Sequence, residues 1–140
     1  MCDQPIKYHS KTNTYIIQKK SYFEKDMFFD GNVITGINTH FWKNLKVNGT
    51  LKLGIGSSIK GNLTAKSAII GSKSKIKCIE VDDNLTLLNG AKIKFATCNG
   101  NTIIHSNCCI DLIKTKGILE IIGAAYIKEM GQCSKVIVRS

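Results

Sequence analysis

Isolated isoleucines recur at a fixed interval along most of the chain, with Gly, Ser, Asn and Lys between them. A constant step in residue number leads from Ile59 to Ile76, Ile93, Ile110 and Ile127. When the sequence is wrapped into rows of that step, with Leu45 as position 1 of a 17-residue row, all five occupy position 15. Chance would place five isoleucines in one column in roughly one wrap in a thousand. The sequence therefore contains an internal repeat.

Other positions of the 17-residue row are also consistently apolar or small, namely positions 1, 3, 7, 9 and 13. Position 9 holds Leu53, Ile70, Leu87, Ile104 and Ile121, position 7 holds Leu51, Ala68, Leu85, Thr102 and Leu119, and position 13 holds Ser57, Ser74, Ala91, Cys108 and Ala125. A step of two residues keeps side chains on the same face of a strand. Each row thus predicts three short strands joined by corners. This pattern indicates an all-β, single-stranded parallel β-helix with three faces and ~17-residue coils.

The corners and the two ends complete this prediction. Asn-Gly pairs at Asn48, Asn89 and Asn99 suit corners, because Asn and Gly tolerate a positive φ. We expect residues 21–140 to form the solenoid, with an upstream coil over 30–44 and an incomplete last coil without a capping helix. Residues 1–20 are expected to be a flexible arm. In the alternative, the arm folds over one end as a cap, and residues 15–17 could pair as a strand.

The charge balance adds a candidate surface. The net charge is +10, from 19 lysines and the single Arg139 against 10 acidic residues. Lysine gives a diffuse positive field, whereas bidentate recognition of a base edge or a phosphate group favours arginine. No specific nucleic-acid binding is therefore expected. Position 16 holds a basic ladder that a polyanion, an anionic membrane or salt would screen. The simpler interpretation is that these lysines suppress lateral aggregation. The ladder consists of Lys60, Lys77, Lys94 and Lys128, with Asp111 in one row.

Nothing in the sequence indicates catalysis, a cofactor or a metal. The six cysteines form no C-x-x-C pair, and the histidines are not expected to belong to the convergent Cys/His cluster that a zinc site needs. Cys108 occupies a small inward column and is expected to be a buried thiol. The N-terminal sequence lacks a signal-peptide pattern, and no apolar run is long enough to span a membrane. We expect a cytoplasmic protein that its basic arm could bring to the inner face of a membrane.

A family resemblance extends this interpretation. The segment KSYFEKDMFFDGNVITG (20–36), followed by LKVNGTLKLG and GSSIKGNLTAKSAIIG, resembles the bactofilins, which are polymer-forming cytoskeletal proteins, and in particular their archaeal members. The resemblance covers residues 19–95 and weakens beyond them. It implies a right-handed β-helix that polymerises end to end without nucleotide and carries no active site. The matching positions are Tyr22, Phe23, Glu24, Phe28, Asp30, Gly31, Val33, Ile34 and Gly36, then Gly49, Gly61 and Gly71.

Three functions remain as hypotheses. The first is a self-assembling structural protein, because terminal coils present unpaired backbone groups as a template for another molecule. Its joints are expected to use Phe28, Phe29, Val33, Val136 and Val138. The second is a hexapeptide-repeat acyltransferase, although such enzymes keep an 18-residue turn and need a general base, usually histidine. The third is a cationic scaffold that binds an anionic membrane or polymer without polymerising.

Overall fold

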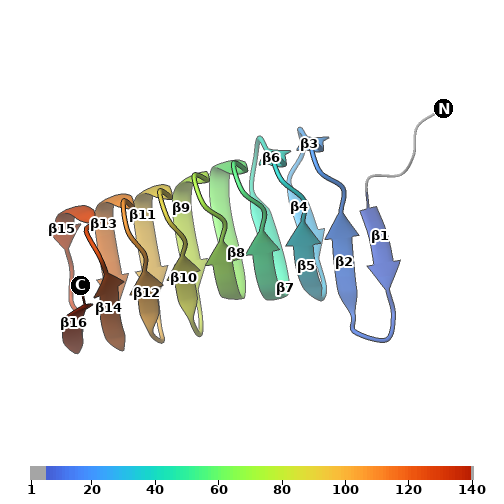
Figure 1. Ribbon diagram of the computed structural model, residues 1–140. Helices are drawn as coiled ribbons and strands as arrows, with labels where there is room; N and C mark the ends of the chain where they lie inside the picture. The colour runs from blue at the N-terminus through green and yellow to red at the C-terminus, as the bar shows by residue number, and fades with distance from the viewer. Residues whose placement is uncertain (1–5, 140) are drawn as a thin grey trace.

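The computed structural model describes residues 6–139, and these residues form a stack of coils about seven turns long. Every element is a β-strand, and all strand pairs except the first are parallel (Figure 1). No helix occurs among residues 6–139, so none of these residues lies in a helix that could cross a membrane. The prediction of a parallel β-helix with ~17-residue coils is confirmed.

Three faces run along the solenoid, and long strands bend around its corners to serve more than one face. The first face contains β1 (Ile6–His9), β2 (Thr14–Ile17), β5 (Asn32–Thr35), β7 (Leu45–Leu53), β8 (Ser58–Ile70), β10 (Leu85–Leu87), β12 (Thr102–Ile104), β14 (Ile118–Ile122) and β16 (Lys135–Arg139). The second face begins with β3 (Tyr22–Phe23) and β6 (His40–Phe41) and continues through the first residues of β8, β9 (Lys75–Val81), β11 (Lys92–Cys98), β13 (Cys109–Thr115) and β15 (Tyr126–Met130). The third begins with β4 (Met27–Phe29) and continues through the remaining parts of β7, β8, β9, β11, β13 and β15.

The spacing between stacked residues changes along the chain. In the early coils, paired residues are 18 positions apart, as in Tyr22 with His40 and Phe41 with Ile59. Later pairs are one position closer in sequence, as in Ile76 with Ile93. The change coincides with register shifts in β7 and β8. Leu63 of β8 pairs with Leu45 in the coil before it and with Ile79 in the coil after it. The extra residue lies between Val47 and Thr50 in β7 and between Ile59 and Asn62 in β8, so the inward columns stay aligned on either side of each shift.

The core consists of the inward columns that the repeat predicted. Ile59, Ile76, Ile93 and Ile110 are at most 3% exposed, and Ile127 in the last coil is half-buried. The position 7 residues Leu51, Leu85 and Leu119 are also fully buried. Stacked β-branched and leucine side chains thus fill one continuous apolar interior, and their burial is the main favourable term for folding.

Asparagine side chains join successive coils at the corners, where the sheet ladder is interrupted. The Asn44 Oδ1 atom accepts a 2.8 Å hydrogen bond from the Asn62 N–H one coil later. The Asn101 Oδ1 atom accepts a 2.8 Å bond from the Ile118 N–H, and Asn32 does the same for Thr50 at 2.9 Å. Each side chain replaces a backbone acceptor that the corner removes, so these N–H groups remain paired.

The N-terminal segment differs from the expected flexible arm. Residues 6–17 form a hairpin in which β1 runs antiparallel to β2, and β2 pairs in parallel with β5. Ile6 lies beside Ile17 and Tyr8 beside Tyr15, so the hairpin extends the first face by two strands. This arrangement is close to the alternative of a folded cap, and the solenoid already includes residues before 21. Residues 1–5 of the expected arm lie outside the described residues.

Candidate functional site: the terminal coils and a lysine-lined groove

The C-terminal coil exposes side chains that belong to the inward columns. Val136 stacks on Leu119 and Val138 on Ile121, yet Val136 is 43% exposed and Val138 68% exposed. Met130 stacks on Ile113 and is 42% exposed. Within residues 6–139, no strand pairs with the outer edges of β15 and β16. This end therefore presents an apolar surface bordered by free backbone groups, and the prediction that the last coil has no capping helix holds within the described residues.

The N-terminal end is partly covered. The ring centroids of Tyr8 and Tyr15 are 4.7 Å apart, and those of Tyr15 and Phe29 are 5.1 Å apart. β3 and β4 each pair on one side only within the described part of the chain. Phe28 points outward and is 60% exposed, with the Lys46 Nζ atom 5.8 Å from its ring centroid. Within residues 6–139, each of the three faces thus ends in a strand with one open edge, namely β1, β3 and β4.

Two of the five residues predicted for the joints lie in the core instead. Phe29 is buried against Tyr15, and Val33 is buried between neighbours in β2 and β7. The sequence could not show this, because the hairpin adds coverage that the 17-residue wrap did not include. Phe28, Val136 and Val138 remain accessible for contact with another molecule.

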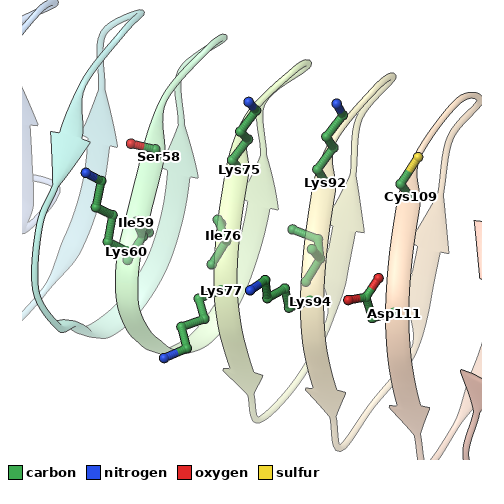
Figure 2. Close-up of a pocket in the computed structure, with 11 residues that line it drawn as sticks. Ser58, Ile59, Lys60, Lys75, Ile76, Lys77, Lys92, Lys94, Cys109 and Asp111 are labelled. Atoms are coloured by element: carbon green, nitrogen blue, oxygen red, sulfur yellow. The ribbon is translucent and has the colours of Figure 1, made fainter. Parts of the chain in front are cut away.

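A groove of about 580 Å³ crosses the second face over four coils (Figure 2). One wall carries Lys75 and Lys92, which are direct neighbours in β9 and β11. The other wall carries Lys60, Lys77 and Lys94. The side chains of Ile59, Ile76 and Ile93 point into the core, so the backbone of these strands forms the floor. Long lysine stems make the walls aliphatic and place the ammonium groups at the rim.

The groove carries little compensating charge. Asp111 lies at its C-terminal end, and no other carboxylate is among its lining residues. The one ion pair formed within residues 6–139 joins Arg139 to Glu120, on the first face. Three of the four predicted ladder lysines line the groove, whereas Lys128 belongs to the last coil and does not. Lys75 and Lys92 form a second row that the sequence analysis missed, although their position 14 could have been found in the same wrap.

An aromatic cluster continues the groove toward the N-terminus. The Lys60 Nζ atom lies 5.3 Å from the centroid of the Trp42 ring, one coil earlier. The Tyr22 ring stacks on His40 at 5.3 Å and meets Trp42 edge-on at 6.4 Å. Tyr22 and Trp42 are 63% and 47% exposed. The 17-residue wrap missed this continuity because stacked residues are 18 positions apart in these coils.

Within the described residues, His40 contacts a serine hydroxyl group and Cys108 lies in the core. The His40 Nδ1 atom lies 2.6 Å from the Ser58 Oγ atom, but no acidic side chain completes a triad with them. No group of three metal-ligating side chains occurs within residues 6–139. Cys108 is fully buried, and this burial raises the pKa of its thiol. Cys108 is therefore a protonated core residue at neutral pH, as its column predicted.

No family model, curated protein or solved structure matches this chain.

Proposed function

We propose that this protein is a non-enzymatic structural protein that self-assembles end to end through its terminal coils, without nucleotide. The carrying observation is the C-terminal end, where Val136 and Val138 continue two buried columns but have no covering coil within residues 6–139. The resemblance to bactofilins supports the same function. A second copy placed on this end would cover the exposed apolar side chains and give the free edges of β15 and β16 a hydrogen-bonding partner.

The N-terminal end suggests how the opposite joint would differ. Contact there would rest on the open edges of β1, β3 and β4 and on the exposed rings of Tyr8 and Phe28. The inward residues Phe29 and Val33 are buried near this end, whereas Val136 and Val138 leave two inward columns exposed at the C-terminal end. We expect a stronger C-terminal joint and a weaker N-terminal joint, which predicts dimers at low concentration and longer rods at higher concentration.

An acyltransferase is the alternative that the fold leaves open. Hexapeptide-repeat enzymes keep an 18-residue turn, and the early coils of this protein have the same spacing. The shorter 17-residue turn therefore speaks against such an enzyme only in the later coils. His40 and Ser58 are in contact, which is a partial resemblance to a base and a nucleophile. The self-assembly proposal is favoured because the described residues provide neither an acidic partner for His40 nor an enclosed acceptor pocket beside it.

Negative-stain microscopy of the purified full chain tests the proposal. Grids would be prepared without nucleotide, at low and at high salt, over a range of protein concentrations. Rods or ribbons under both conditions are expected, because the joints are apolar and hydrogen-bonded rather than ionic. Uniform monomer-sized particles at every concentration would refute end-to-end assembly. Incubation with acetyl-coenzyme A and amine acceptors is the parallel control, and turnover there would refute the non-enzymatic part.

The expected location and further partners stay predictions. A cytoplasmic protein with a basic face could also associate peripherally with an anionic membrane or polymer, in addition to polymerising.

A further inference from the structure

We propose that the lysine-lined groove and the adjoining aromatic cluster form one sequence-independent binding site for single-stranded nucleic acid. The site consists of Trp42 at one end and Lys60, Lys75, Lys77, Lys92 and Lys94 along the groove. It lies on the second face, away from the exposed inward side chains of the C-terminal coil, and does not depend on end-to-end assembly.

The charges of the groove match the backbone of a flexible polyanion. Successive coils are about 4.8 Å apart, so the lysines of each wall stand in a row at this spacing. Lys75 and Lys92 are nearest neighbours in register and repel each other unless an anion lies between them or nearby. Asp111 can neutralise one end of the opposite wall, and the other lysines have no carboxylate among the groove residues. A chain of phosphates along the groove would supply the missing negative charge.

Trp42 gives the site a feature that a purely ionic ligand would not use. Its ring is about half exposed and carries the Lys60 ammonium group on one side. Proteins that bind single strands without sequence preference combine a cationic groove with aromatic rings on which bases stack. A base stacked at Trp42 would place its phosphate beside Lys60, at the start of the groove. The two halves of the site are therefore arranged as one path for a single strand.

Other anionic ligands fit less well. A bilayer is flat, and the apolar residues of the groove floor point into the core and cannot insert into lipid. Duplex DNA keeps its bases paired inside the helix and would offer none of them for stacking on Trp42. The groove contains no arginine, which is the residue that reads base edges through a planar fork, so the site is expected to ignore base sequence. Inorganic polyphosphate would bind the lysines but leave Trp42 unused.

The full chain is tested with a labelled oligothymidylate of about ten nucleotides, by fluorescence anisotropy and by emission from Trp42, the single tryptophan. We expect binding that quenches Trp42. Neutralising up to five phosphates gives a slope of log affinity against log salt no steeper than about −3.5, at about −0.7 per phosphate, so affinity falls at most about 130-fold between 50 and 200 mM salt. Polyphosphate of about ten units should bind with a similar slope and without stacking-type quenching.

Variants separate the charge from the stacking. Lys75→Gln/Lys92→Gln should reduce the slope by about 1.4. Lys66→Gln/Lys116→Gln is the matched control, because it removes the same charge from exposed positions outside the groove and should leave the slope near its wild-type value. Trp42→Ala should weaken oligothymidylate binding about 5- to 150-fold, the range that loss of one stacked base allows, and should leave polyphosphate binding unchanged. Trp42→Phe should restore part of the loss. Circular dichroism confirms that each variant is folded.

Several results would overturn the proposal. No binding of oligothymidylate at 50 mM salt would remove the site altogether. Equal effects of Trp42→Ala on oligothymidylate and polyphosphate, or none on either, would leave a site for anions without stacking. Binding to phosphatidylserine vesicles but not to oligothymidylate would assign the face to a membrane instead. Rods seen by microscopy together with any of these results would leave end-to-end assembly intact and refute this inference alone.

Discussion

Replacing Val136 and Val138 with lysine tests the proposed C-terminal joint most directly. Both side chains belong to inward columns, and both lie on the last strand, so they are already largely exposed in a single molecule. Their loss should therefore change the stability of the isolated coil stack little. In a joint, by contrast, the two lysines of each copy would have to enter an apolar contact or be held beside the lysines of the partner.

The exposed fractions set the size of the effect. Full burial of a valine is worth about 2 kcal/mol, and 43% of Val136 and 68% of Val138 remain to be covered. Covering them contributes about 2 kcal/mol for each copy and about 4.5 kcal/mol for a joint between two C-terminal ends. Since about 1.4 kcal/mol is a factor of ten, Val136→Lys/Val138→Lys should weaken this joint at least about 1,000-fold, before charge repulsion is included.

Light scattering coupled to size exclusion measures the outcome across protein concentrations. Wild-type protein is expected to show concentration-dependent association that the double variant loses. Ile118→Lys/Ile137→Lys is the matched control, because these side chains lie in the outward columns of β14 and β16 and it adds the same charge at the same end. If the double variant associates like the wild type, or if the control loses association to the same degree, the C-terminal end is not the joint.

Three further predictions concern the solenoid itself. Leu85→Ala, in a fully closed inward column, should lower the free energy of unfolding by about 2–5 kcal/mol, measured by denaturant titration, with the exposed Thr97→Ala of β11 expected to change it by less than about 0.5 kcal/mol. Asn101→Ala should lower the free energy of unfolding by about 1–2 kcal/mol because it leaves the Ile118 N–H without its acceptor. Asn101→Asp keeps an oxygen atom at this place and should recover much of the lost stability. Equal unfolding midpoints for the two variants would contradict this explanation. Burial raises the pKa of Cys108 above its unfolded value, so its contribution to stability is full below the unfolded pKa of about 8.5 and is lost as pH rises toward the folded pKa. Cys108→Ala should therefore flatten the fall in thermal midpoint above about pH 8.5, and an unchanged slope would count against this origin.

The sequence was sufficient for the parts of the fold that repeat. Ile59, Ile76, Ile93 and Ile110 stack as their common column predicted, because a step of two within a strand and a fixed coil length leave one possible register. The hairpin was not predictable from the repeat. β1 runs antiparallel and belongs to no 17-residue row, so its pairing depends on contacts such as Tyr8 with Tyr15 that periodicity does not encode.

The candidate site was likewise predictable only in the part that follows the 17-residue repeat. The position 16 lysines follow from the wrap, and three of them line the groove. Trp42 joins them only after the one-residue change in coil length between β6 and the later strands is known. Phe29 and Val33 were assigned to the joints because they are apolar and near the start of the solenoid, but their burial depends on the strands placed beside them by the hairpin. Long-range coverage of this kind decides exposure, and a single column of residues does not contain it.

The corner asparagines have a consequence for how such a chain can change its length during evolution. Each one bonds to the residue one coil later, and each coil contacts only its neighbours. Duplicating or deleting one complete row would keep every column, corner and coil-to-coil bond in place and would change the rod by about 4.8 Å. Inserting a single residue within a strand would turn the following inward side chains outward. Rod length is thus a property that whole-repeat duplication can adjust without redesigning the core.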